Sequence, residues 1–185
     1  IPLRLVGSEM CIRDSNYTEQ GDGHAVILMH GMFGSLSNLG NLARYLADHY
    51  RVISVDLRNH GDSPHDPTMD IPSMANDVVD LMDELGLPDA RLVGHSLGGK
   101  IAMQVALNHP DRVAKLVVAD ISPVAYNPRQ DATLDALLEL SSATILNRAE
   151  ADALMAKHVP EHSTRAFLLK NLGRNVEGNY SLKLN

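Results

Sequence analysis

The chain has 185 residues, of which 44% are hydrophobic, and this suits one domain with a buried core. Its net charge of −7 disfavours the basic face of a nucleic-acid-binding protein. It contains no apolar run of about 18 residues, so the sequence given holds no membrane-spanning helix. Its single cysteine, Cys11, excludes a disulfide within the chain and favours a reducing compartment, and we expect the cytoplasm.

The first fifteen residues, IPLRLVGSEMCIRDS, differ in character from the rest. Their apolar residues are interrupted by Glu9, Arg13 and Asp14, unlike those of a signal peptide. The stretch VGSEMCIRDS resembles a translated sequencing adaptor, and the alternative is a genuine first strand, IPLRLV. We expect residues 1–15 to be a non-native, adaptor-derived segment and exclude them from functional argument.

Four short apolar runs predict strands, at residues 25–29, 52–55, 91–93 and 115–119. The first and the last are continuously apolar, which is typical of parallel strands buried on both faces. Helical spacing of apolar residues between the runs predicts helices at about 39–49, 73–85 and 97–108. This alternation predicts an α/β fold with a parallel, doubly wound sheet and right-handed crossovers.

After Asp120 the pattern changes. Three amphipathic helices are predicted, at about residues 131–140, 147–158 and 163–172, with no convincing strand before the last few residues. This block is typical of a helical insertion that sits on the sheet. We expect a core over residues 16–124 and a helical cap over residues 125–185, both partial.

The strongest chemical signal is Gly94-His95-Ser96-Leu97-Gly98, which fits the pattern G-x-S-x-G. It follows a predicted strand and opens a predicted helix, which is the context of a nucleophile elbow. On so sharp a turn the neighbouring residues must be small, and the serine hydroxyl is held near a helix N-terminus. Ser96 is therefore the candidate nucleophile, although a glycine-rich turn can also arise by chance.

A second loop, HGMFGS from His30, follows the first strand. Together with DLRNHGDSP from Asp56, GHSLGGK from Gly94 and VVADISPV from Val117, it resembles the α/β-hydrolase family. The resemblance is greatest to small bacterial YbfF-type esterases, which act on acyl-CoA and short acyl esters, and it runs from about residue 20 to the end of the chain.

The resemblance implies an oxyanion hole made of two backbone N–H groups. Leu97 supplies one of them, and Met32 the other, with Phe33 as second choice. It also implies that Asp120, after the strand next to the elbow, orients the catalytic histidine. Adjacent strands lie about 4.8 Å apart, so a carboxylate there would be close to Ser96. The polar loop after Asp56 is expected to shape the floor of the site, where His60 and Ser63 could touch substrate.

A serine nucleophile needs a general base. The chain has nine histidines, and none has a convincing position for this role. His95 precedes the nucleophile and should point away from its hydroxyl. In the family the base follows the last strand of the sheet, so we expect the final strands and the base beyond residue 185, and we expect this chain alone to be nearly inert.

The preferred interpretation is a serine hydrolase that cleaves carboxylic ester or acyl thioester bonds through an acyl-serine intermediate. Its partner would be a small acyl substrate, with no nucleic acid and no cofactor. Apolar cap residues could line an acyl pocket or simply pack the cap on the sheet: Leu134, Leu137, Leu138, Leu154, Met155, Phe167 and Leu168. The alternatives are a carbon–carbon bond hydrolase or lyase of the same fold and a non-catalytic binding module.

Overall fold

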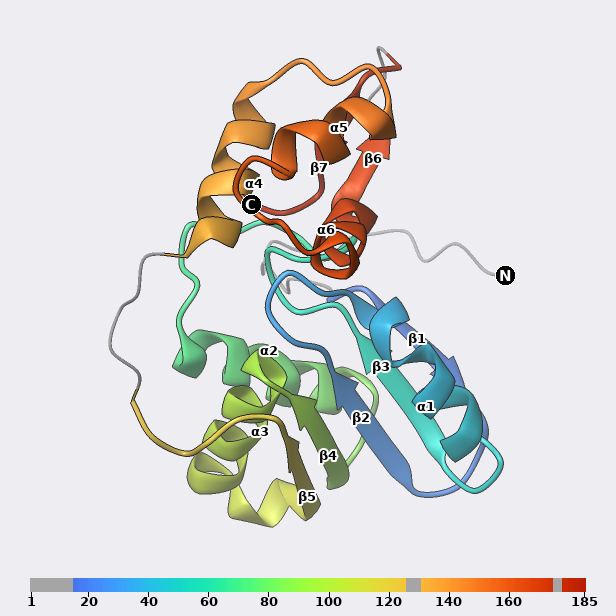
Figure 1. Cartoon of the computed structure of the whole chain (residues 1–185). Coiled ribbons are helices and arrows are strands. Elements are labelled where there is room, and N and C mark those ends of the chain that lie inside the picture. The colour runs from blue at the N-terminus through green and yellow to red at the C-terminus, as the bar shows by residue number, and fades with distance from the viewer. Residues whose placement is uncertain (1–14, 126–130, 175–177) are drawn as a thin grey trace, which may run out of the picture.

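A computed structural model describes residues 15–125, 131–174 and 178–185, and its centre is a five-stranded sheet (Figure 1). The sheet order is β1-β3-β2-β4-β5. Strands β2 to β5 are mutually parallel, and β1 runs antiparallel to β3 at one edge. The strands are β1 (Tyr17–Gln20), β2 (Ala25–Met29), β3 (Arg51–Val55), β4 (Ala90–His95) and β5 (Val113–Ala119).

Helices cover both faces of this sheet. The helices α2 (Ile71–Glu84) and α3 (Leu97–Asn108) pack on one face, and α1 (Gly40–Leu46) packs on the other. Side chains of β2 alternate between the two cores: Ile27 and Met29 face α2 and α3, whereas Val26 and Leu28 face α1. The predicted doubly wound α/β fold is confirmed. Short 3₁₀ turns lie at η1 (Leu36–Leu39) and η2 (Pro110–Arg112).

Residues after 131 form a separate layer above the carboxyl ends of the strands (Figure 1). It contains α4 (Ala132–Ser142), α5 (Arg148–Met155), α6 (His162–Leu168), η3 (Leu169–Asn171) and a short hairpin of β6 (Leu172–Arg174) and β7 (Tyr180–Leu182). These elements share their own buried apolar cluster. We propose on this basis a core over residues 16–124 and a cap over residues 125–185.

The cap helices begin where the sequence predicts them. The Asn147 side chain accepts a hydrogen bond from the Glu150 backbone N–H at 3.0 Å and donates to the Glu150 carboxylate at 2.8 Å. This reciprocal pair satisfies an N–H group that the first turn of α5 would otherwise leave without a partner.

Three expectations need correction or lie outside the described residues. The sheet is not wholly parallel, because the polar strand β1 (YTEQ) pairs antiparallel with β3. Strand β5 is not buried on both faces: it is the last strand of the described sheet, and Leu116 and Val117 are 39% and 53% exposed. Of the segment 1–15, only Ser15 is described, so its proposed origin stays a prediction.

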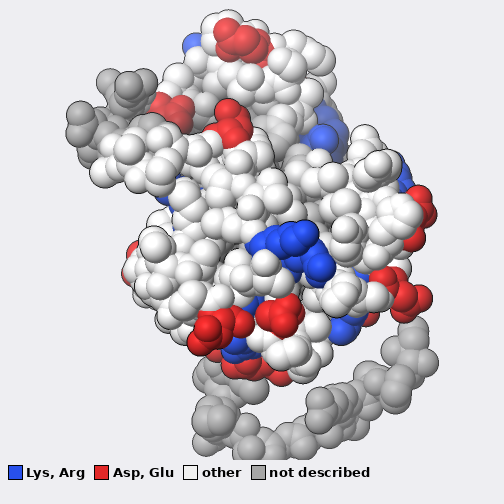
Figure 2. Space-filling view, turned by 90° about the horizontal axis from the view of Figure 1, so that it is seen from below, with Lys and Arg blue, Asp and Glu red and all other residues white. Residues whose placement is uncertain are grey.

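The surface charge is spread out on the face that Figure 2 shows. Basic and acidic side chains lie there in small mixed groups rather than in one basic patch. Of the helices in the described ranges, none is both long and apolar enough for a membrane crossing.

The exposed edge strand β5 gives a prediction for this 185-residue chain. Unpaired strand edges with apolar side chains promote association, and a lysine on such a strand opposes it. We expect the chain to self-associate as its concentration rises, and Val117→Lys to reduce that association in light-scattering measurements. Leu107→Lys is the control, because Leu107 is 78% exposed but lies on helix α3. Monomeric wild-type chain at high concentration would contradict the prediction.

Candidate active site

Ser96 occupies a sharp turn between β4 and α3. Its backbone is left-handed, with φ 50° and ψ −113°, a conformation that L-residues rarely adopt. Two glycines make the turn possible. A Cβ atom on Gly94 would lie 2.2 Å from the Gly98 carbonyl oxygen, and one on Gly98 would lie 2.4 Å from that of Met29. The predicted strand-turn-helix geometry is therefore present.

Hydrogen bonds on both sides of the turn fix the Ser96 backbone. Its N–H donates to the Ala119 carbonyl of β5 at 2.9 Å, and its carbonyl accepts from the Lys100 N–H of α3 at 3.1 Å. The side chain is half-buried and opens into a pocket of about 360 Å³. The pocket is lined by His30, Gly31, Met32, Gly34, Asn38, Leu39, His95, Ser96 and Phe167.

The loop of residues 30–34, which we call the oxyanion loop, is held in place by hydrogen bonds of the buried His30 ring. Its Nε2 accepts a hydrogen bond from the Leu57 N–H at 3.1 Å, so the proton is on Nδ1, which donates to the Gly31 carbonyl at 2.8 Å. The His30 carbonyl accepts from the Gly98 N–H at 3.1 Å. Burial lowers the pKa of His30 to about 4, so the ring is neutral at pH 7. Neutral His30 thus ties this loop to two strand ends and to α3.

His60 has the same role in the loop after the neighbouring strand β3. Its Nε2 accepts from the Phe33 N–H at 3.1 Å, and its Nδ1 donates to the Arg58 carbonyl at 2.9 Å. Burial lowers the pKa of this ring as well. The Phe33 N–H, our second choice for the oxyanion hole, is therefore occupied. The N–H groups of Met32 and Leu97 have no hydrogen-bond partner among residues 15–125, 131–174 and 178–185.

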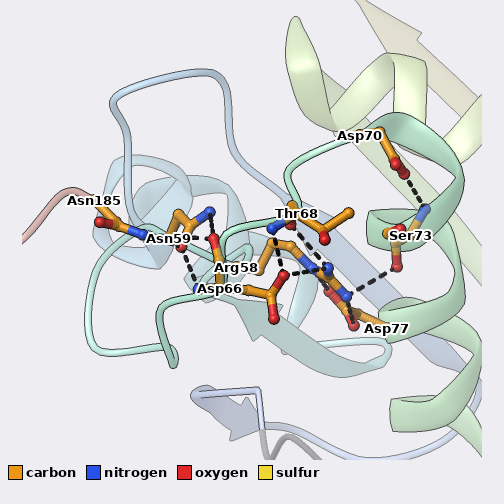
Figure 3. Close-up of polar contacts among 8 residues, drawn as sticks. All are labelled: Arg58, Asn59, Asp66, Thr68, Asp70, Ser73, Asp77 and Asn185. Carbon is orange, nitrogen blue, oxygen red and sulfur yellow. Dashed lines mark hydrogen bonds and ion pairs between the residues drawn. The ribbon is translucent and has the colours of Figure 1, made fainter.

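The loop that carries His60 is fixed by an ion pair to α2 (Figure 3). The Arg58 guanidinium donates to both carboxylate oxygens of Asp77, at 2.6 and 2.5 Å. Asn59 exchanges two hydrogen bonds with the Asp66 backbone, at 2.9 and 2.7 Å. Asp70 then caps α2 by accepting from the Ser73 N–H at 2.7 Å. These contacts hold the loop, and with it His60, in place.

The polar side chains of Asp56 and Ser63 are also engaged in hydrogen bonds. The buried Asp56 carboxylate accepts from the Leu36 N–H at 2.7 Å, from the Asn16 side chain at 2.7 Å and from the Asp62 N–H at 3.0 Å. The buried Ser63 hydroxyl donates to the Asp56 carbonyl at 2.6 Å. Neither Ser63 nor His60 lines the pocket of Ser96.

Asp120 directly follows β5, next to the elbow strand, also with a left-handed backbone at φ 56°. Its side chain is 86% exposed, and its Oδ2 lies 3.6 Å from Nε2 of His95. His95 therefore reaches the pocket wall and the candidate acid. All nine histidines lie in the described ranges, and none is hydrogen-bonded to Ser96 Oγ there.

The left-handed backbone is concentrated at one edge of the sheet. Within the described ranges four non-glycine residues have positive φ: Phe33, Asn59, Ser96 and Asp120. They follow β2, β3, β4 and β5 respectively. Strained backbone of this kind is found preferentially at functional sites. Carboxyl ends of parallel strands are also where α/β sheets bind ligands.

The apolar cap residues have different surroundings. Of the seven named from the sequence, only Phe167 lines the pocket of Ser96. Leu137, Met155 and Leu168 are buried in the cap cluster, whereas Leu134 and Leu138 are 48% and 59% exposed. Most of them thus pack the cap or face solvent. Asn38 and Leu39 of η1 line the pocket and were not predicted, because neither belongs to a motif.

The buried His30 gives a prediction about pH. Its folded-state pKa is about 4 against 6.5 in the unfolded chain, so the unfolded state binds more protons between these values. The contribution of His30 to the free energy of unfolding is fully present above pH 6.5. It is lost as the pH falls toward 4, and the loss amounts to about 3 kcal/mol. Urea unfolding at pH 7, 6, 5 and 4 would measure it. His30→Gln should flatten the slope, and an unchanged slope would contradict the assignment.

Comparisons with known proteins agree with this geometry. A family described as the alpha/beta hydrolase fold matches residues 24–172. Esterase YbfF of Escherichia coli is 42% identical over 161 residues, which are 86% of this chain and 63% of that protein. The sn-1-specific diacylglycerol lipase ABHD11 of Mus musculus is 42% identical over 169 residues, which are 87% of this chain and 55% of that protein.

The chain thus spans less than two thirds of the length of either relative. Among solved structures, a marine microorganism esterase superposes with a TM-score of 0.87 at 34% identity, over 92% of this chain and 68% of that one. The family match covers most of the chain, and the sheet, the elbow and the relatives agree with it. The chain belongs to the alpha/beta hydrolase fold family.

Proposed function

We propose that the whole protein is a serine hydrolase that cleaves carboxylic esters or acyl thioesters through an acyl-serine intermediate. The observation that carries this proposal is Ser96, held left-handed at the elbow with its side chain opening into a pocket of about 360 Å³. The names of the relatives, an esterase and a diacylglycerol lipase, support acyl ester chemistry. Residues 16–185 contain no cysteine and therefore no disulfide, which is consistent with action in a reducing compartment such as the cytoplasm.

In the proposed reaction Ser96 Oγ attacks the acyl carbonyl carbon while a general base takes the hydroxyl proton. The carbonyl oxygen becomes an oxyanion that accepts hydrogen bonds from the Met32 and Leu97 N–H groups. The carbon–oxygen or carbon–sulfur bond breaks, and the base returns the proton to the leaving alcohol or thiol. Water, activated by the same base, then hydrolyses the acyl-serine and frees the carboxylic acid and Ser96.

The general base is a histidine in this proposal. Because no histidine is hydrogen-bonded to Ser96 Oγ within the described ranges, the proposal assigns the base to a residue of the whole protein outside them. Asp120, exposed beside the elbow, is the acid that would orient that histidine. This leaves His95 as a pocket-wall residue.

The pocket favours an uncharged acyl group. Its walls include the apolar side chains of Met32, Leu39 and Phe167, and its two histidine neighbours include the neutral His30. Desolvation of a charged acyl chain against this surface would be unfavourable. An uncharged acyl chain is therefore the proposed acyl group of the substrate.

One prediction concerns the nucleophile. In the whole protein, Ser96→Ala should lower kcat for hydrolysis of a short p-nitrophenyl ester by about 10⁶-fold, because attack and proton transfer are lost together. Ser37→Ala is the control, since Ser37 lies on η1 outside the pocket of Ser96. Wild-type hydrolysis that survives in Ser96→Ala would contradict the proposal. Hydrolysis of esters without cleavage of the carbon–carbon bond of a diketone would exclude the alternative of a carbon–carbon bond hydrolase or lyase.

Another prediction concerns the acid. Asp120→Asn should lower kcat by about 10⁴-fold while the protein stays folded, because the base would lose its orienting carboxylate. Asp111→Asn is the matched control, because Asp111 precedes the opposite end of the same strand. Equal activity of the two variants would remove Asp120 from the proposed triad.

A further inference from the structure

Phe33 joins the core to the cap. Its N–H donates to His60 Nε2 of the core at 3.1 Å, and its carbonyl accepts from Nδ2 of Asn171, in the cap, at 2.8 Å. Its side chain packs against the buried cluster of the cap. The Phe33 backbone is left-handed, at φ 60°. A phenylalanine keeps such a conformation only where its surroundings hold it, and here both of its peptide groups are held.

Asn171 is built into this contact. It lies at the end of η3 and is only 4% exposed. Its side-chain amide also donates to the Leu168 carbonyl at 3.0 Å. The two N–H groups of this amide therefore donate to two backbone carbonyls, which the carboxylate of an aspartate could not do. The contact joins residues 138 positions apart in the sequence, so it forms only when the cap is seated on the core.

The same cap segment reaches the candidate active site. Phe167, four residues before Asn171, lines the pocket with Ser96 and Met32. The Phe33 carbonyl and the Gly34 N–H belong to one planar peptide group, and this N–H donates to the Gly31 carbonyl at 3.0 Å. The Gly31 carbonyl in turn shares a peptide group with the Met32 N–H, so a movement of the Phe33 carbonyl changes the direction of that N–H. An oxyanion donor acts only if it points to the developing charge, and small misplacements weaken it strongly.

We propose that Asn171 is a positioning residue, which holds the oxyanion loop through the Phe33 carbonyl and so makes the donor geometry at Met32 depend on the seating of the cap. The inference rests on the proposed function only in its catalytic consequence. The coupling itself, from cap amide to oxyanion loop, is a property of the folded protein.

The experiment compares three variants of the whole protein: Asn171→Ala, Asn171→Asp and Arg148→Met. Arg148 is the matched control because it donates to the Leu169 and Leu172 carbonyls, on either side of Asn171, without contacting Phe33. Two measurements report on the loop without any substrate. These are amide hydrogen exchange at Phe33 and titration of the His60 ring by nitrogen NMR.

In Asn171→Ala we expect about tenfold faster exchange at Phe33, since the peptide loses one of its two anchors. The pKa of His60, which burial lowers, should rise, because a loosened oxyanion loop exposes the ring to water and releases its Nε2 from the Phe33 N–H. Arg148→Met should change neither. Asn171→Asp should exceed the alanine effect, and if the aspartate variant fails to fold, the alanine variant alone decides. Unchanged exchange and titration in Asn171→Ala, or equal changes in Arg148→Met, would overturn the proposal.

Ester hydrolysis provides the catalytic readout. Asn171→Ala should lower kcat about tenfold or more with KM little changed, because the lost interaction acts in the transition state. A raised KM at constant kcat would overturn the assignment to the oxyanion loop. If the wild-type protein hydrolyses no ester, the proposed function fails, whereas exchange and titration still decide whether Asn171 holds the loop.

Discussion

The site depends on one backbone constraint, the reversal of the chain at Ser96. The left-handed residue joins a buried strand to a helix without an intervening loop, so neighbouring backbone must approach within distances that exclude a Cβ atom. Gly94 and Gly98 satisfy this requirement, and Gly31 lets the oxyanion loop lie against the His95 and Ser96 side chains. Other residues at these positions would force either the elbow or the oxyanion loop to move.

The strained backbone after the strand ends is held by hydrogen bonds to polar side chains that burial keeps neutral. His30 and His60 each accept one backbone N–H and donate to one carbonyl, and their rings lie 5.2 Å apart. A protonated ring could not accept, so the same burial that lowers each pKa preserves the hydrogen bonds. His30 and His60 are therefore supports of the backbone of the oxyanion loop, a role that leaves them unsuited to proton transfer.

Local patterns predicted most of the core and the elbow. The motif around Ser96 and the apolar run of β2 are set by neighbours in sequence, so their structure could be predicted from a few residues. Strand β1 could not, because its polar residues acquire strand geometry only by pairing with β3. Periodicity also could not distinguish a buried strand from β5, whose exposure depends on what lies beside it. The contact of Asn171 with Phe33 joins distant segments and leaves no local signal.

The central claim is that Ser96 is an activated nucleophile in the whole protein. Reaction with a fluorophosphonate probe, followed by mass spectrometry of the labelled peptide, tests this most directly because such probes modify activated serines rather than merely exposed ones. The account predicts a single modified residue, Ser96, and no labelling of the 185-residue chain alone, which lacks the proposed base. Labelling of another serine, or none in the whole protein, would contradict the claim, and labelling of the short chain would place the base within it.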